Sequence, residues 1–75
     1  MENNEETESS VLRKKRIALV TNEAEKVFGS SVSALAWLNQ RNLALCAIPM
    51  AMLDTDERAH EVLKVLAAIS YGVSA

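Results

Sequence analysis

Apolar residues recur every three or four positions along much of this chain, which is the spacing of residues on one face of an α-helix. The first apolar stripe runs over residues 11–28, and Gly29 is well placed to end a helix there with a left-handed turn. Within this stripe, Asn22 and Glu25 have the spacing of a helix-capping box. The stripe therefore predicts either one helix or two helices with a break near Thr21.

Two further segments are almost entirely apolar. Residues 32–38 form a short helix-like run that contains Trp37, the only tryptophan, and the serines before it offer a cap. Residues 43–53 carry no charge, and Pro49 fits best in the first turn of a brief helix because no backbone amide is needed there. This second segment is predicted to be buried on several sides.

The last periodic segment has the charge pattern of a helix with a defined start. Asp54 or Thr55 can cap it, acidic residues follow near its positive end, and Lys64 comes later, as the helix dipole prefers. Gly72 can end this helix. Its apolar stripe is expected to face the core and consists of Ala59, Val62, Leu63, Leu66 and Ile69.

These segments predict an all-α fold, a small compact bundle of about four to five short helices over residues 11–75, because no strand-like alternation or repeat interrupts them. Residues 1–10 are polar and acidic and are expected to form a disordered tail, in which Ser9 or Ser10 caps the first helix. Trp37 is interpreted as the central core aromatic, with an exposed binding anchor as the alternative. The expected core comprises Phe28, Leu35, Trp37, Leu38, Val62, Leu66 and Ile69.

Size and composition indicate a protein that meets another chain. With 75 residues and 49% hydrophobic residues, the chain holds more aliphatic side chains than so small a core can cover, so a homo-oligomer or a hetero-oligomer is expected. The net charge of −2 argues against general binding of nucleic acid or acidic membranes. The basic run at residues 13–16 is interpreted as solvated, with contact to DNA phosphates or an acidic protein surface as the weaker alternative.

No catalytic, metal-binding or cofactor-binding set can be assembled from the sequence, so the protein is not expected to be an enzyme. His60 and Cys46 are the only residues of their types, and neither belongs to a nucleophile or metal motif. Gly29 and Gly72 are the only glycines, which excludes phosphate-binding glycine loops. A lone cysteine suits the reducing cytoplasm, and the uncharged residues 43–53 are too few to span a bilayer. A cytoplasmic protein without a membrane segment is therefore expected.

Several residues recur in a recognisable order over about residues 24–75. They are Val27, Phe28, Gly29, Ala34, Trp37, Leu38, Asn42, Ala44, Leu45, Pro49, Leu53, Asp54, Thr55, Val62, Leu66, Ile69, Tyr71 and Gly72. In these residues the chain resembles the toxin-binding domain of the Xre/MbcA/ParS-type antitoxins, a bacterial family paired with RES-domain toxins.

The chain departs from that family in three respects. Cys46 and Ala47 replace a common glycine pair, and Arg58 replaces a common glycine. Residues 1–20 are too short for the helix-turn-helix domain that many members carry.

The resemblance implies a function as an antitoxin that binds a RES-domain toxin, an enzyme that consumes NAD or transfers from it, and keeps this toxin inactive. It further implies that the carboxy-terminal segment occludes the toxin's active site, because a short tail with a free carboxylate can enter a pocket built for a charged nucleotide. Direct binding of nucleic acid is not expected. The last helix and residues 43–53 are the implied docking surface. The implied toxin-binding residues are Pro49, Met50 and Leu53 on this surface and Tyr71, Gly72, Val73, Ser74 and Ala75 in the occluding segment.

Two other functions stay open at this point. A helical scaffold that only associates with itself is the main alternative, because of the excess of aliphatic residues. A DNA-binding regulator is a third possibility, based on the basic run at residues 13–16. Met50 and Met52 fit either a core or an adaptable contact surface, because methionine packs well in both.

Overall fold

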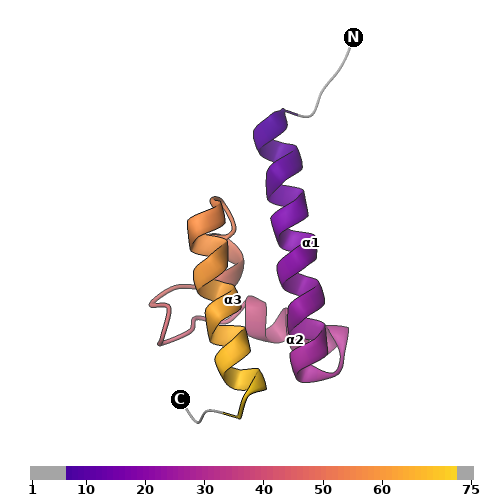
Figure 1. Ribbon diagram of the computed structural model, residues 1–75, viewed down its shortest axis with the longest axis vertical. Helices are drawn as coiled ribbons and strands as arrows, with labels where there is room; N and C mark the ends of the chain where they lie inside the picture. The colour runs from indigo at the N-terminus through magenta and orange to yellow at the C-terminus, as the bar shows by residue number, and fades with distance from the viewer. Residues whose placement is uncertain (1–6, 73–75) are drawn as a thin grey trace.

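The computed structural model describes residues 7–72 of the chain, which form three α-helices and one 3-10 helix (Figure 1). The predicted all-α class is confirmed for these residues. The predicted number of four to five helices is not, because most of the segment between α2 and α3 forms a loop. The elements are α1 (Glu8–Phe28), α2 (Ser31–Leu38), η1 (Pro49–Met52) and α3 (Asp56–Ser70).

Helix α1 is a single helix of 21 residues. It starts earlier than predicted, because the side chain of Thr7 accepts a hydrogen bond from the amide of Ser10 at 3.1 Å and so caps the first turn. The predicted tail at residues 1–10 therefore overlaps this first turn, while residues 1–6 lie outside the described residues.

The suggested break in the middle of α1 does not occur. Val20 and Ala24, on either side of the suggested position, are both fully buried. Because residues four apart lie one above the other on a helix, the same face of α1 meets the core on both sides of Thr21. A continuous core contact outweighs the weak capping signal of Asn22 and Glu25.

Gly29 and Ser30 turn the chain sharply between α1 and α2. Gly29 has a φ of +82° and its amide donates to the carbonyl of Glu25 at 2.8 Å, as in a left-handed helix end. The hydroxyl of Ser30 then caps α2 by accepting from the amide of Ser33 at 3.1 Å. As a result α2 runs back across the lower half of α1, toward the space between α1 and α3, which lie side by side (Figure 1).

The core lies where α1, α2, η1 and α3 meet. It is built from small and aliphatic side chains, and each large aliphatic one contributes about 1.5–3 kcal/mol by leaving water. Its buried hydrophobic residues are Val20, Ala24, Ala34, Leu38, Met52, Leu53, Ala59, Val62 and Leu66.

The predicted core residues occupy three different environments. Leu38, Val62 and Leu66 are fully buried, whereas Phe28, Trp37 and Ile69 are half-buried. The expectation for Leu35 is wrong, since it is exposed. Helix α2 has only two turns and meets the core along Ala34 and Leu38, so Leu35 lies to one side.

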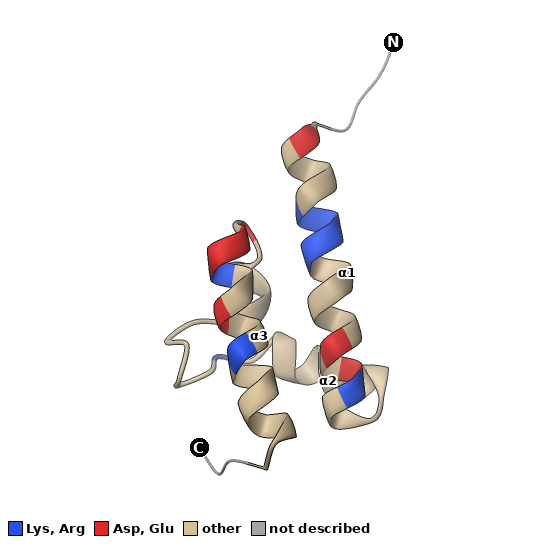
Figure 2. Ribbon diagram, viewed as in Figure 1, with Lys and Arg blue, Asp and Glu red and all other residues tan. Residues whose placement is uncertain are grey.

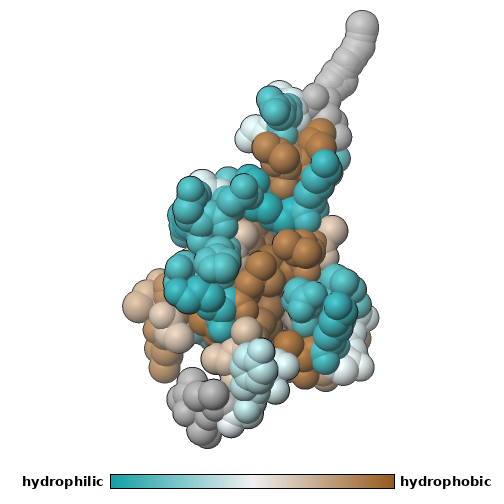
Figure 3. Space-filling view, viewed as in Figure 1, coloured by the Kyte–Doolittle hydropathy of each residue, from teal (hydrophilic) through white to brown (hydrophobic). Residues whose placement is uncertain are grey.

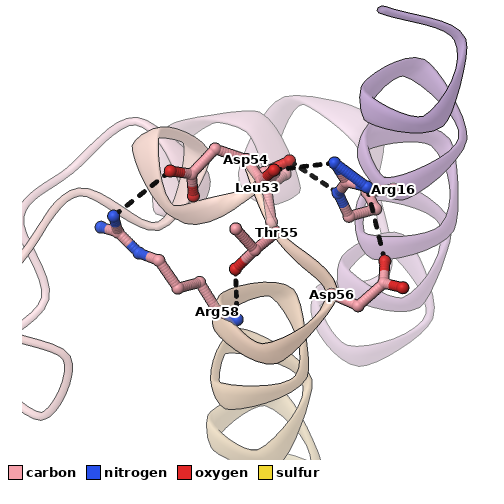
Figure 4. A network of polar contacts seen from close by, with 6 residues as sticks. All are labelled: Arg16, Leu53, Asp54, Thr55, Asp56 and Arg58. Atoms are coloured by element: carbon pink, nitrogen blue, oxygen red, sulfur yellow. Dashed lines mark hydrogen bonds and ion pairs between the residues drawn. The ribbon is translucent and has the colours of Figure 1, made fainter. Parts of the chain in front are cut away.

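Arg16 connects α1 to the turn that precedes α3 (Figure 4). Its Nε donates to the carbonyl of Leu53 at 3.0 Å, and a terminal nitrogen donates to the carbonyl of Asp54 at 2.8 Å. The other terminal nitrogen lies 3.4 Å from a carboxylate oxygen of Asp56. Only 12% of the Arg16 side chain is exposed, so the interpretation of the whole basic run as solvated is wrong at this residue.

Candidate partner-binding site

A loop held by Asn42 separates α2 from η1. The backbone of Asn42 pairs with that of Ala47 in a short antiparallel bridge, with N–O distances of 2.9 and 3.4 Å. The side-chain oxygen of Asn42 also accepts from the amide of Leu45 at 3.0 Å. These bonds close the turn and push its tip outward, so that Leu43 is 89% exposed. The prediction that this part of residues 43–53 is buried is therefore wrong.

Cys46 completes the turn with a φ of +56°, in the left-handed region that favours glycine. A non-glycine residue costs about 1–2 kcal/mol there, so Cys46 holds backbone strain at this turn. We expect Cys46→Gly to raise the free energy of unfolding by about 0.5–1 kcal/mol, measured by urea denaturation. Cys46→Ala is the matched control, because it removes the thiol and keeps the side-chain carbon. Equal stability of the two variants would contradict this explanation.

A groove of about 470 Å³ lies between this loop, the end of α2 and the second half of α3. Trp37 forms part of its wall and stacks at a tilt on Phe28, with 5.7 Å between the ring centroids. That contact fixes the indole while leaving it half-buried. The groove is lined by Trp37, Gln40, Arg41, Asn42, Leu43, Ala44, Val65, Ala68 and Ile69.

The groove is almost free of charge. Among residues 7–72, Arg41 is the one charged residue that lines it, since residues 42–53 and 65–72 contain no acidic or basic residue. Figure 2 shows the contrast with the rest of the described chain, where charges gather on α1 and at the start of α3. An uncharged centre that contains a large aromatic and exposed aliphatic side chains is typical of a protein-binding surface.

The end of α3 leaves further side chains accessible next to this surface. Tyr71 is 84% exposed, and its amide donates to the carbonyl of Ala67 at 3.0 Å. Gly72 has a φ of +74° and donates to the carbonyl of Ile69 at 2.9 Å, so the chain leaves the helix at this residue. The loop lies on the side of α3 that faces away from α1 (Figure 1).

The implied toxin-binding residues are divided between core and surface. Leu53 and Pro49 are buried, so their side chains offer no surface to a partner. They pack in the core and support the segment that leads into α3. Met50 is half-buried and faces a different groove, beside α1. Tyr71 and Gly72 are exposed at the end of α3. The remaining three residues of the predicted occluding segment, Val73, Ser74 and Ala75, lie outside the described residues.

The groove lies partly inside the predicted docking regions. Leu43 belongs to residues 43–53, and Val65 and Ala68 belong to the last helix, although none of the three was singled out, and Arg41 lies outside both regions. These residues are in separate segments, and only the folded chain brings them together. The one signal in the sequence is the absence of charge from two segments, residues 42–53 and 65–72. An uncharged segment predicts burial as readily as a binding surface, so this signal alone does not locate the groove.

No chemical cluster accompanies the groove within residues 7–72. His60 is exposed on the first half of α3, and Cys46 is exposed at the loop. No three histidine, cysteine, aspartate or glutamate side chains in this range come together as a set that could hold a metal ion. Nor is any helix in the same range both long and apolar enough to cross a membrane.

Comparison with known families places this surface within a toxin-binding domain. The sequence model of the family described as "Antitoxin Xre/MbcA/ParS C-terminal toxin-binding domain" matches residues 23–72, which is more than half of the chain. The chain belongs to this antitoxin family. The matched region includes every residue that lines the groove, together with Tyr71 and Gly72. Searches of curated proteins and of solved structures gave no match.

The family assignment gives the toxin-binding domain a toxin as its partner. The match starts at Glu23, within α1, so most of α1 precedes the matched region. Helix α3, the loop and α2 lie wholly inside it. The uncharged groove is thus part of the family domain, whereas the basic run at residues 13–16 precedes it.

Proposed function

We propose that this toxin-binding domain neutralises a RES-domain toxin, an NAD-consuming enzyme of the bacterial cytoplasm, by docking its groove on the toxin and placing its carboxy-terminal segment in the toxin's active site. The observation that carries this proposal is the family match over residues 23–72, which contains both the groove and the end of α3. The chain contributes no chemistry in this account. It acts by binding and by excluding substrate.

The groove provides the docking energy in this proposal. Leu43 is 89% exposed at its edge, and burying such a side chain against a partner contributes about 1.5–3 kcal/mol. Trp37 is fixed by Phe28 and still partly accessible, which suits an anchor that loses little side-chain entropy on binding. Arg41 at the edge suits an acidic group on the toxin and would set the orientation of the complex.

The end of α3 positions the occluding segment. Val62 and Leu66 anchor α3 in the core, so the helix is a rigid support for the residues that follow it. Gly72 turns the chain out of the helix, and Tyr71 is exposed beside this turn. A short segment held at a fixed point loses less entropy on entering a pocket than a free peptide does. The proposed occluding residues are Tyr71, Gly72, Val73, Ser74 and Ala75.

A pair of charge substitutions tests the docking surface. Leu43→Glu is expected to weaken binding to a purified RES-domain toxin by at least about tenfold, measured by isothermal titration calorimetry, because it places a carboxylate in the apolar contact. Val32→Glu is the matched control, since Val32 is 78% exposed on α2 and lines none of the grooves described in this protein. It is expected to change the affinity less than twofold.

Both exposed positions tolerate a charge, so the helical circular dichroism signal of both variants should match that of the unchanged chain. Equal affinity of Leu43→Glu and Val32→Glu for the toxin would remove the groove as the docking surface. Failure of the unchanged chain to bind any RES-domain toxin would remove the proposed function itself.

A further inference from the structure

A second apolar surface lies along α1, on the side of α3 opposite to the docking groove. Leu12 and Leu19 are 43% and 53% exposed, although both are large aliphatic residues. They are seven residues apart, so they lie on the same face of the helix. Figure 3 shows hydrophobic surface along α1 and in the valley between α1 and α3. The first turns of α1 extend past the start of α3, so no other helix of the described chain covers them (Figure 1).

This face continues into a groove between α1 and α3. The groove has a volume of about 330 Å³ and is bounded on the α3 side by Leu63, Leu66 and Ala67. On the α1 side it is bounded by Leu19, Glu23 and Val27. Leu12, Lys15, Leu19, Glu23 and Val27 follow one another at intervals of three or four, so they share one face of α1. Together with the α3 side of the groove this face forms a surface that we call the α1 strip, defined by Leu12, Lys15, Leu19, Glu23, Val27, Leu63 and Ala67.

The charges of the α1 strip are arranged symmetrically about Leu19. Lys15 precedes Leu19 by four residues and Glu23 follows it by four residues. Each therefore lies about one helical turn from Leu19, on the same face and on opposite sides. If two such helices pack in antiparallel directions around a two-fold axis at Leu19, each Lys15 lies opposite a Glu23. Parallel packing would instead place Lys15 opposite Lys15 and Glu23 opposite Glu23.

We propose that the α1 strip binds a second copy of this chain, with the two α1 helices antiparallel and the two-fold axis at Leu19. In this dimer, Leu19 packs on its own counterpart and two Lys15–Glu23 pairs flank the contact, because a two-fold interface repeats each interaction. Leu12 of each copy reaches the groove of the other, beside Val27 and Leu63. The projecting end of α1 in each copy thereby covers the groove between α1 and α3 of the other copy.

A second copy fits this strip better than the toxin does. Leu12, Lys15 and Leu19 all precede the family match, which begins at Glu23. The docking groove proposed above lies on the other side of α3, along Val65 and Ala68. Self-association through the α1 strip is therefore independent of the proposed function and leaves the toxin-binding surface accessible.

Sedimentation velocity of the full chain over a range of concentrations tests this dimer. The unchanged chain is expected to be dimeric, and Leu19→Glu is expected to raise the dimer dissociation constant at least about a hundredfold by placing two carboxylates at the axis. Lys15→Glu should raise it about tenfold, because both charge pairs become repulsive. The double variant Lys15→Glu with Glu23→Lys should recover most of that loss. Leu43→Glu should leave the dimer unchanged.

Circular dichroism distinguishes loss of the dimer from loss of the fold, since Glu23 also lies 3.2 Å from Lys26 within the chain. A monomer at all concentrations would overturn the proposal. So would a dimer that tolerates Leu19→Glu, or a double variant that associates no better than Lys15→Glu alone. If Leu19→Glu instead abolishes toxin binding, the α1 strip belongs to the toxin and the proposal is wrong.

Discussion

Replacing Arg16 with alanine is expected to lower the free energy of unfolding by about 2–3 kcal/mol, because the carbonyls of Leu53 and Asp54 lose a charged donor. Leu53 is fully buried, so water does not easily replace the lost bond to its carbonyl. A small domain has only about 5–15 kcal/mol of stability in total. The loss should appear in urea denaturation as a lower midpoint with an unchanged slope.

Arg58→Ala provides the matched control for this prediction. Arg58 belongs to the same polar network, but its guanidinium contacts only a carboxylate oxygen of Asp54, at 3.4 Å (Figure 4). Both side chains of this pair are about half exposed, and such pairs contribute at most about 1 kcal/mol. If the two alanine variants are equally stable, Arg16 does not hold α1 to the start of α3.

Deleting Val73, Ser74 and Ala75 is expected to abolish neutralisation of the toxin in cells while the complex still forms. The groove and the core of α3 remain intact in this variant, so docking persists with an affinity reduced by about tenfold or more. The active site of the toxin is then open to substrate. Growth after induction of the toxin, together with co-purification of the two proteins, measures the two effects separately.

Deletion of residues 1–6 is the control for this truncation, because it shortens the chain at the end opposite to the proposed occluding segment. This variant should neutralise the toxin fully. Full protection by the chain that ends at Gly72 would rule out occlusion by Val73, Ser74 and Ala75, and neutralisation would then rest on docking and on the residues up to Gly72.

The sequence was sufficient to predict much of the fold because its helical signals are local. The apolar periodicity located all three α-helices, and Gly29 ends α1 as expected. The cap at Thr55 was one of two predicted, and its side chain accepts from the amide of Arg58 at 3.1 Å. The start of α1 was missed by three residues, because Thr7, Ser9 and Ser10 all have side chains suited to a cap.

The parts that the sequence did not predict depend on contacts between distant segments. Arg16 bonds to carbonyls 37 and 38 residues later in the chain, and no local pattern separates it from the basic residues beside it. Leu43 and Leu53 bound the same uncharged segment, yet one is exposed and the other is buried. The turn closed by Asn42 decides that difference, through hydrogen bonds that composition does not encode.

The candidate site was only partly predicted for the same reason. The family resemblance pointed to the end of α3 and to the segment around Pro49, and the structure places Tyr71 on the surface and Pro49 in the core. The groove is lined by Trp37 and Arg41, from α2 and the loop after it, and by Ala68 from α3. Its location follows from how the end of α2, the loop and α3 come together, which is a property of the packed chain.

The rate of NAD consumption by a purified RES-domain toxin, titrated with this chain, tests the central claim most directly. We predict that NAD consumption falls in proportion to the chain added and stops when every toxin active site is matched by one toxin-binding domain. An unchanged rate of NAD consumption in the presence of saturating chain would contradict the account.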